Sequence, residues 1–368
     1  MDPTLLTQPG FWDDLTPLAM RGSAPSLAEL EGHVLFETSG SSGTPKQVAI
    51  SKHALLLSAD AVNFHLRVTA NSTWGLALPL HHVGGFGVAA RAYRAECRLQ
   101  VFSNRWNAAR FGEWLIETTV THTSLVPTQV HDLVSAKIAA PNGLIAVVVG
   151  GGQLDAKTGQ AARDLGWPVL ASYGMTEAGS QIATQGLEAL SEIYQPSPLP
   201  LLPIWEASVS DEGVLAIRGG ALFSGVVMDG IFTPRTSEWH QTSDRVVLEN
   251  HSLTPLGRVD SLVKVLGELV DPQAIEVELM SCSGNQLAPG SFAIVAIPDE
   301  RAENRLIPVF AAGVDATLIG AALECYEEKA AGFLRLSRPL IVEKLPVSEM
   351  GKIRRVILLG MVRNILLE

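Results

Sequence analysis

Residues 144–152 read LIAVVVGGG, an apolar run closed by three glycines that is typical of a buried strand followed by a tight turn. Comparable runs are HVLFE at 33–37, TWGLALPL at 73–80 and PVLASYG at 168–174. A helix is expected over 51–66, where apolar residues recur on one face and Ser51 is a candidate N-cap. The alternation of buried strands and helices predicts an α/β fold with a mostly parallel sheet.

The chain has 368 residues, which exceeds one ordinary domain core. Residues 185–206 form a proline-rich connection in which apolar residues do not recur with the spacing of a helix. The short strands expected after it are more typical of an antiparallel sheet. A second change of character falls near 257–261, and Asp271 with Pro272 then begins a helix as N-cap and first helical residue. We therefore expect a large domain over 1–259 and a small α+β domain over 260–368.

Composition and charge exclude several classes of protein. Hydrophobic residues make up 47% and charged residues 18% of the chain, with a mean hydropathy of +0.22, so the chain buries a core and is not disordered. The net charge of −11 repels polyanions, so a nucleic acid or an anionic lipid surface is not an expected partner.

The three cysteines, Cys97, Cys282 and Cys325, are far apart in the sequence and form no C-x-x-C pattern. This spacing disfavours structural zinc and a disulfide framework, and buried free thiols are expected. The sequence begins without the basic and apolar pattern of a secretory signal, and no apolar run is long enough for a membrane helix. A cytoplasmic location is the expectation.

The segment from Thr38 to Lys46 carries the first chemical signal. Its small residues allow a tight turn around an anion, and its N–H groups, hydroxyls and lysine would donate to phosphate oxygens. The residues are Thr38, Ser39, Gly40, Ser41, Ser42, Gly43, Thr44 and Lys46. We expect this loop between a buried strand and a helix. A flexible surface loop is the alternative, and Pro45 before the lysine distinguishes the segment from a Walker A loop.

Further motifs follow in order along the chain. They are Pro79-Leu-His-His82, Val149-Gly-Gly-Gly152, Ser172-Tyr-Gly-Met-Thr-Glu177, Thr242-Ser-Asp244, residues 257–267 (GRVDSLVKVLG) and residues 345–354 (LPVSEMGKIR). Together with the serine-rich loop, this order resembles the ANL superfamily of adenylate-forming enzymes, and the resemblance covers nearly the whole chain. It implies an α/β fold in which a large domain with parallel-rich sheets flanked by helices holds ATP and the acid. A small mobile α+β domain acts as a lid.

The resemblance also implies roles for individual residues around ATP and Mg²⁺. Glu177 would ligate Mg²⁺, Thr176 would bind the α-phosphate, and Lys352 would bridge the carboxylate and the α-phosphate. The remaining ATP-site residues implied are Gly151, Gly152, Ser172, Tyr173, Gly174, Met175, Asp244 and Arg258, with Tyr173 against adenine and the last two on the ribose.

The same resemblance implies a two-step cycle. Asp260 stands at the hinge position, about which the lid would rotate to exchange the Lys352 face for the loop of Lys264 and Gly267 in the thioester step. His82 would gate or orient the acyl carboxylate, although a structural histidine is the alternative, and His81 is expected to be structural.

Within the superfamily, the motifs at 79–85, 124–129 and 172–181 look most like the o-succinylbenzoate–CoA ligases of menaquinone biosynthesis. Polar candidates for the acyl pocket are Thr128, Gln129, Ser180 and Gln181. The alternative for each is that it is an ordinary polar residue of a surface loop. The sequence departs from the family in the short stretch of 37 residues before Thr38, in Ser261 at the hinge, and in Val226 where an aromatic residue is usual. These departures bear on the shape of the acyl pocket.

The expected function is an acid–thiol ligase that uses ATP and CoA to activate and transfer a carboxylic acid, most simply o-succinylbenzoate. One alternative keeps the chemistry and changes the acid, or replaces free CoA with a carrier-bound thiol. The other alternative is a nucleotide-binding module without catalysis, which would need neither Lys352 nor Glu177. The expected partners are these small molecules, and a homodimer is left open.

Overall fold

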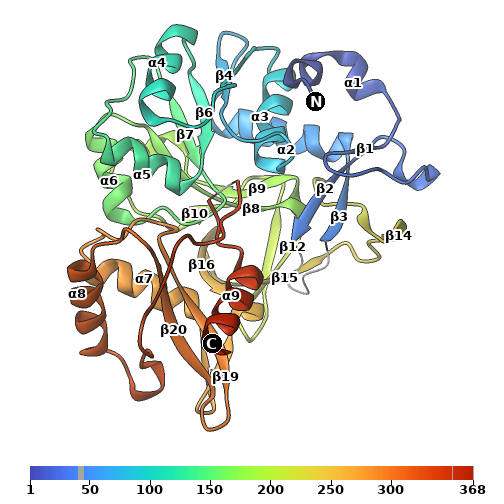
Figure 1. Cartoon of the computed structure of the whole chain (residues 1–368). Helices are drawn as coiled ribbons and strands as arrows, with labels where there is room; N and C mark the ends of the chain where they lie inside the picture. Colours follow the sequence, from blue (N-terminus) through green and yellow to red (C-terminus); the bar gives the residue numbers. More distant parts are fainter. Residues whose placement is uncertain (40–44, 350, 368) are drawn as a thin grey trace. The chain divides into compact units, whose positions relative to one another are not determined.

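The computed structural model describes residues 1–39, 45–349 and 351–367, and the chain folds into two compact units. The first unit comprises Met1–Thr242 and Val246–Pro255, and the second comprises Ser243–Arg245 and Leu256–Glu368. Each mixes helices with sheets (Figure 1), which confirms the α/β class. The functional division into 1–259 and 260–368 stays a prediction.

A six-stranded sheet forms the centre of the first unit, in the order β5-β4-β6-β7-β8-β9. Its strands run parallel except for the last pair, β8 and β9, which is antiparallel. Helices connect successive parallel strands, as parallel pairing requires. The bounds are β4 Thr73–Leu76, α3 Val83–Arg94, β5 Arg98–Val101, α4 Ala108–Thr118, β6 His122–Leu125, α5 Pro127–Ser135, β7 Ala146–Val149, α6 Ala156–Asp164, β8 Val169–Met175 and β9 Ser180–Thr184.

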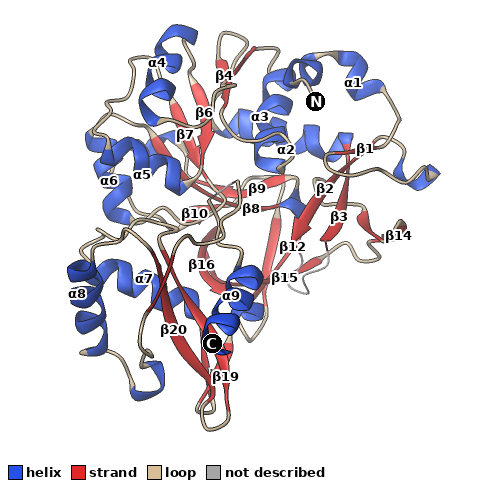
Figure 2. Ribbon diagram, viewed as in Figure 1, coloured by secondary structure: helices blue, strands red, loops and turns tan. Residues whose placement is uncertain are grey.

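Helices cover both faces of this sheet. Figure 2 shows α2 (Lys52–His65) and α3 on one side of β4, β6 and β7, and α4, α5 and α6 on the other. Accordingly, Val147, Val148 and Val149 of β7 are all buried, and the strand reads as a continuous apolar run without polar alternation. This explains why LIAVVVGGG could be recognised as a strand.

Two further sheets of five strands are mostly antiparallel, so parallel pairing dominates only in the central sheet. Their orders are β1-β2-β3-β13-β14 and β10-β16-β15-β12-β11. The bounds are β1 Leu18–Ala19, β2 His33–Ser39, β3 Pro45–Ser51, β13 Gly225–Met228, β14 Ile231–Pro234, β10 Leu199–Pro200, β11 Glu206–Val209, β12 Val214–Arg218, β15 His240–Glu249 and β16 Ser252–Arg258. The chain passes between the two units within β15 and β16.

The remaining elements of the first unit are short. The N-terminal segment contains a 3-10 turn and a single helical turn, and three further 3-10 turns interrupt the loops. They are η1 Pro3–Thr7, α1 Pro9–Asp13, η2 Ala28–Leu30, η3 Thr176–Ala178 and η4 Leu187–Ser191. Of these, η3 matters most for function because it carries Thr176 and Glu177.

The serine-rich loop does not lie between a strand and a helix, so that expectation was wrong. It joins the antiparallel strands β2 and β3, which pair from His33↔Ser51 to Ser39↔Pro45. The β-branched Val48 and Ile50 extend the chain after the loop, and both are fully buried. Helix α2 begins only after β3, where the Ser51 hydroxyl accepts the N–H of Ala54 as the expected N-cap. The expected strand over 73–80 also ends earlier, at Leu76.

The second unit has three layers, with a sheet in the order β19-β20-β21 between helices. Alternate residues of β19 divide between its faces, since Phe292 and Ile294 pack into the core under α7 and α8, whereas Ala293 and Val295 pack under α9. A separate hairpin pairs β17 with β18. The bounds are η5 Val259–Ser261, β17 Val263–Val265, β18 Glu268–Val270, α7 Pro272–Cys282, β19 Phe292–Asp299, β20 Glu303–Ala311, α8 Ala316–Glu327, η6 Gly332–Leu334, β21 Leu340–Val342 and α9 Arg355–Leu367.

Helix α7 starts as the sequence predicts. The Asp271 carboxylate accepts the N–H of Gln273 at 2.9 Å, and Pro272 occupies the first helical position. No helix among the residues that the structure describes is long and apolar enough to cross a membrane.

Candidate active site

The motif of residues 172–177 occupies the end of β8 and the turn after it. Antiparallel β9 returns directly beside this segment, with a register irregularity between Tyr173 and Gly174. A Cβ atom at Gly174 would lie 1.8 Å from the carbonyl oxygen of Ser180, a distance that no side chain tolerates. Glycine is therefore required there, because the two backbones touch.

Side chains behind this strand hold it in place. The hydroxyls of Ser172 and Thr184 share a hydrogen bond of 2.9 Å, and Thr184 donates to Oε1 of Gln181 at 2.6 Å. The backbone N–H of Ala171 donates to the side chain of Gln185 at 2.9 Å. These buried hydrogen bonds connect β8 to β9 and the residue after it. They therefore fix the backbone on which Tyr173 and Gly174 lie.

Lys46 and Glu177 bring the serine-rich loop and the motif of residues 172–177 together. The Nζ atom of Lys46, at the start of β3, donates to Oε1 of Glu177 at 3.2 Å. Both side chains are partly exposed, so the pair is accessible to a ligand. The Thr38 hydroxyl, opposite Lys46 in the hairpin register, is buried without a hydrogen-bond partner among the described residues. The first unit therefore brings together the ammonium group of Lys46, the carboxylate of Glu177 and the hydroxyl of Thr38, which has no hydrogen-bond partner among the described residues.

The middle of the serine-rich loop falls outside the residues that the structure describes. This applies to the predicted phosphate-binding residues Gly40, Ser41, Ser42, Gly43 and Thr44. Ser39 is the last residue of β2, and Lys46 follows Pro45 at the start of β3. The described strands therefore end at Ser39 and resume at Pro45 on either side of these residues.

The glycine turn of residues 150–152 follows β7, the strand that pairs directly with β8. The N–H of Gly150 donates to the carbonyl of Leu125 at 3.1 Å, and Gly151 adopts a φ of 77°, which favours glycine. An ideal Cβ on Gly150 would stand 3.8 Å from the Ser172 carbonyl oxygen. Gly151 and Gly152 therefore follow β7 at the same edge of the parallel sheet as Tyr173, where the carboxyl ends of β7 and β8 meet.

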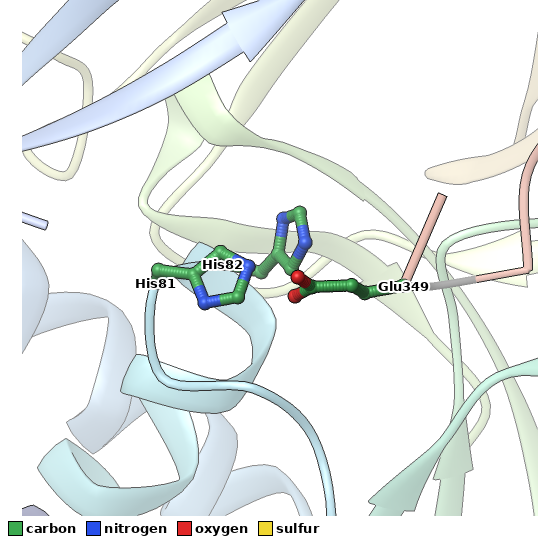
Figure 3. A group of neighbouring side chains, drawn as sticks. All are labelled: His81, His82 and Glu349. Atoms are coloured by element: carbon green, nitrogen blue, oxygen red, sulfur yellow. The ribbon is translucent and has the colours of Figure 1, made fainter. Parts of the chain in front are cut away.

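His81 and His82 lie where the loop after β4 enters α3, with His82 as the residue before the first helical position. Their ring centroids are 4.4 Å apart (Figure 3). Nη2 of Arg21 lies 2.8 Å from Nε2 of His81, which gives His81 a cationic neighbour. Gly85 is required next to them, because a Cβ there would lie 2.3 Å from the carbonyl oxygen of Pro79.

The four acyl-pocket candidates differ in what their side chains do. The side-chain oxygen of Gln129 accepts the N–H of Val126 at 3.0 Å and so caps α5. Gln181 accepts from Thr184, as described above. Thr128 stands half-buried in the first turn of α5. Ser180 has a φ of 135°, a strained value for a residue with a side chain, and its hydroxyl faces an arginine.

That arginine, Arg91 on α3, was not predicted from the sequence. Its surface is only 2% exposed, and its guanidinium donates to the hydroxyls of Ser180 at 3.3 Å and Ser124 at 3.4 Å. It also lies 5.3 Å from the ring of Trp74. No carboxylate among the described residues pairs with it, and its Nε has no acceptor there. Burial lowers the pKa of Arg91 to about 9.

An unpaired buried guanidinium is costly, so its presence indicates a ligand or a specific structural role. The sequence signal was available, since Arg91 interrupts the small apolar helix GGFGVAARAY at 84–93. A Cβ at Gly87 would stand 3.2 Å from its Nη2, so the glycine makes room for the guanidinium. Arg91, Ser124 and Ser180 form one buried polar group within the first unit, which we call the Arg91 cluster.

In the second unit, the predicted ribose and hinge residues form one ion-pair group. Arg258 donates to both oxygens of Asp260, at 2.8 and 2.7 Å, and to Asp244 at 3.0 Å. The hydrogen bonds from Arg258 lower the pKa of Asp260. Asp244 comes from β15 and Arg258 from β16, so the pairing of these strands assembles the group.

Lys352 projects from a small hairpin of the second unit. Val347 and Ile353 form an antiparallel bridge, and the Lys352 N–H donates to the Ser348 hydroxyl at 3.1 Å. Between them, Met350 is outside the described residues. The side chain of Lys352 is exposed. The hairpin thus holds the backbone of Lys352 in place.

Lys264 and Gly267 belong to the β17–β18 hairpin of the same unit. Gly267 has a φ of 86°, and its N–H donates to Glu303 at 2.8 Å. The carbonyl of Lys264 accepts from Asn304 at 2.9 Å, and its side chain is exposed. The turn is therefore anchored to β20, on which both partners lie.

These observations can be compared with known proteins. A family model described as AMP-binding enzyme matches residues 28–225, which include the serine-rich loop, both histidines and the motif of residues 172–177. The chain belongs to the AMP-binding enzyme family. This confirms the resemblance seen in the sequence.

Curated relatives refine the comparison. The 2-succinylbenzoate–CoA ligase of Haemophilus influenzae is 30% identical over 256 residues, covering 68% of this chain and 54% of the relative. That of Escherichia coli is 30% identical over 241 residues, covering 65% and 50%. The ligase of Listeria monocytogenes is 27% identical over 345 residues, covering 90% and 71%. The chain spans about half the length of the first two relatives.

Solved structures share the fold. A variant of Escherichia coli MenE with bound OSB-AMS matches at a TM-score of 0.74 and 26% identity, covering 93% of this chain and 71% of that one. MenE from Bacillus subtilis in complex with the acyl-adenylate intermediate OSB-AMP matches at 0.74 and 23% identity, covering 88% and 68%. The fold of this chain is therefore similar to the fold of these enzymes over most of its length.

Proposed function

We propose that this protein is an ATP-dependent acid–thiol ligase that activates o-succinylbenzoate as its acyl-adenylate and transfers the acyl group to CoA, as a step of menaquinone biosynthesis. The observation that carries the proposal is the contact between Lys46 and Glu177. It joins the end of the serine-rich loop, which would bind phosphate, to a carboxylate in the turn after β8. The relatives named 2-succinylbenzoate–CoA ligase support the choice of acid and product.

The described residues fit ATP with Mg²⁺. Lys46 engages Oε1 of Glu177, which leaves Oε2 for a cation, and hard cations prefer carboxylate and phosphate oxygens. When bound, Mg²⁺ would neutralise charge on the phosphates during attack by the carboxylate. The orphaned Thr38 hydroxyl would donate to a phosphate oxygen and so regain the hydrogen bond that it lacks. Thr176, beside Glu177 in η3, would reach the α-phosphate.

The Arg91 cluster supports a substrate with a second negative charge. o-Succinylbenzoate carries two carboxylates and a ketone, and only one carboxylate reacts with ATP. The buried guanidinium of Arg91 would pair with the distal carboxylate, and the hydroxyls of Ser124 and Ser180 would hold the guanidinium in position. A monoacid would leave the buried charge uncompensated, which gives the site a physical basis for selectivity.

The roles of the second unit complete the proposal. Lys352 would stabilise the charge that develops between the acid and the α-phosphate. Asp260 would be the hinge, since it lies in the short η5 turn and its carboxylate is held by Arg258. The anchored turn of Lys264 and Gly267 would serve the thioester step, in which the CoA sulfur displaces AMP from the acyl carbon.

Product analysis tests the proposal. The chain is incubated with ATP, Mg²⁺, CoA and one acid from a panel of o-succinylbenzoate, benzoate, malonate and a medium-chain fatty acid, and thioesters are identified by mass spectrometry. We expect o-succinylbenzoyl-CoA and AMP in equal amounts, and little product from the monoacids. A thioester from another acid alone would reassign the substrate, and adenylate without thioester would reassign the thiol. Nucleotide binding without turnover for any acid would refute the ligase assignment.

A further inference from the structure

Two cysteines that the ligase chemistry does not use lie against each other in the second unit. Cys282 is the last residue of α7, and Cys325 lies in the last turn of α8. Their sulfur atoms are 2.7 Å apart although 43 positions separate them in the sequence. Both are free thiols and partly exposed, as is Cys97, so the expectation of free thiols was right and the expectation that they are buried was wrong.

The packing of two helices produces this contact. Leu279 of α7 and Ala322 of α8 belong to the same core cluster, and α7 packs along α8. Each cysteine lies three residues beyond one of these core positions, which places it on an adjoining part of the same helix face. The sulfur atoms are therefore held together by the core of the second unit.

The geometry requires little movement for a covalent bond. A disulfide has a sulfur–sulfur distance of about 2.05 Å, so the two atoms need to approach by only about 0.6 Å. Because a bond of this kind closes a long loop, it would restrict the unfolded chain and stabilise the folded unit.

A lysine lies next to the pair. Nζ of Lys329 lies 3.5 Å from the Cys325 sulfur and 3.8 Å from the Cys282 sulfur. An ammonium group at this distance stabilises a thiolate, which is the reactive species. Burial and the neighbouring Cys325 raise the pKa of Cys282, and Glu278 acts in the same direction, whereas Lys329 opposes them. We assign the first nucleophilic attack to Cys325, whose sulfur is the closer of the two to Lys329.

We propose that Cys282 and Cys325 form a reversible redox pair, which a low-molecular-weight disulfide oxidises to an intramolecular disulfide that joins α7 to α8. The Cys325 thiolate attacks one sulfur of the oxidant and expels the first thiolate. Cys282 then attacks the Cys325 sulfur of the mixed disulfide and expels the second thiolate. The two protons of the cysteines pass to the two released thiols, so one disulfide is reduced as the other forms. This pair is independent of the proposed ligase function.

Thiol counting tests the pair on the intact chain. The protein is equilibrated with mixtures of oxidised and reduced glutathione, quenched with acid, denatured, and alkylated with N-ethylmaleimide before mass spectrometry. We expect two thiols to disappear together in one transition, with a linked peptide that contains both Cys282 and Cys325. Alkylation of all three cysteines at every glutathione ratio would refute the pair, as would a linked peptide that contains Cys97.

Matched variants separate the pair from general oxidation. Cys97→Ser should show the same transition, whereas Cys282→Ser and Cys325→Ser should form no intramolecular disulfide and retain at most two glutathiones, one on each remaining cysteine. An intramolecular disulfide in either of these last two variants would contradict the assignment. Thermal unfolding gives a second measurement, since the oxidised wild type should unfold at a higher temperature than its reduced form, and Cys325→Ser should show no such difference.

The rate of oxidation tests the lysine. Lys329→Gln should slow disulfide formation at neutral pH about threefold or more, because the thiolate loses its nearest positive charge. Lys344→Gln, which changes an exposed lysine elsewhere in the same unit, is the control and should react like the wild type. Equal rates for Lys329→Gln and the wild type would show that the lysine does not activate the pair.

Discussion

Nζ of Lys46 lies 3.2 Å from Oε1 of Glu177, although 131 positions separate the two residues. The contact depends on the β2–β3 hairpin, which places Lys46 at the start of β3, and on the close β8–β9 pair, which flanks the turn of Glu177. One positive and one negative side chain from distant parts of the sequence are thereby placed side by side in the first unit.

Arg91→Met should separate substrate binding from stability. The change removes the charge that would hold the distal carboxylate, so the KM for o-succinylbenzoate should rise about 10- to 100-fold, which corresponds to a charged hydrogen bond worth roughly 1.5–3 kcal/mol. The free energy of unfolding should stay constant or rise by about 1 kcal/mol, because an unpaired buried charge is removed. Steady-state kinetics and urea unfolding measure the two quantities.

The control for that variant is Arg94→Met on the same helix. Arg94 forms an exposed ion pair with Asp60 at 2.7 Å, so its loss should change stability by less than about 1 kcal/mol and leave KM unaltered. An unchanged KM in Arg91→Met would remove Arg91 from substrate binding. A large loss of stability in that variant would assign Arg91 a purely structural role.

Lys352→Ala should slow adenylate formation about 100- to 1,000-fold, because a cation that stabilises the developing charge is lost. Thioester formation from supplied acyl-adenylate should continue, since that step does not use this side chain. Quenched-flow measurements of the two half-reactions test this, and Lys344→Ala is the matched control. Equal losses in both half-reactions would contradict the separate roles of the two hairpins in the second unit.

Asp260→Pro should preserve adenylation and block thioester formation. Proline fixes φ near −65° and so prevents the backbone change on which domain rotation depends. Asp260→Ala also loses the ion pair with Arg258 but keeps backbone freedom, so it should carry out both half-reactions. Full turnover by the proline variant would exclude a hinge at this residue.

His122 should make stability depend on pH. Burial lowers the pKa of His122 to about 4, below its ordinary value of 6.5, so the folded state binds a proton less readily than the unfolded state. The contribution of His122 to the free energy of unfolding is fully present above pH 6.5. As the pH falls toward 4, the free energy of unfolding decreases by up to about 3 kcal/mol.

Urea unfolding between pH 7.5 and 4 measures this dependence. His122→Phe keeps an aromatic ring beside Trp74 and removes the titrating group, so its stability should fall less over the same range. Identical slopes for the variant and the wild type would show that other groups control the pH dependence.

Much of the fold could be predicted because its strands are buried on both faces. The continuous apolar runs at β7 and β8 need no knowledge of their partners to be recognised. The β2–β3 hairpin was missed because a segment rich in Gly, Ser and Thr can precede either a strand or a helix, and because β3 is directly followed by α2. Its pairing with β2 and β13 decided its conformation, and those contacts are not local in sequence.

The residues of the candidate site that belong to short sequence motifs could be predicted. Those whose role depends on packing between distant elements could not. Gly174 and Glu177 belong to one short motif. The role of Arg91 depends instead on the fold, because α3 places its guanidinium within hydrogen-bond distance of Ser124 and Ser180. Gln129 looked like a pocket residue but caps its own helix, a use that a polar residue near a helix start often has.

The most direct test of the central claim is acid-dependent exchange of labelled pyrophosphate into ATP, which reports adenylate formation alone. The wild type should exchange only when o-succinylbenzoate and Mg²⁺ are present. Glu177→Gln should reduce the rate about 100-fold or more, and Glu188→Gln, an exposed glutamate nearby in the sequence, should retain it. Exchange that does not depend on the acid, or a Glu177→Gln variant as active as the wild type, would contradict the account.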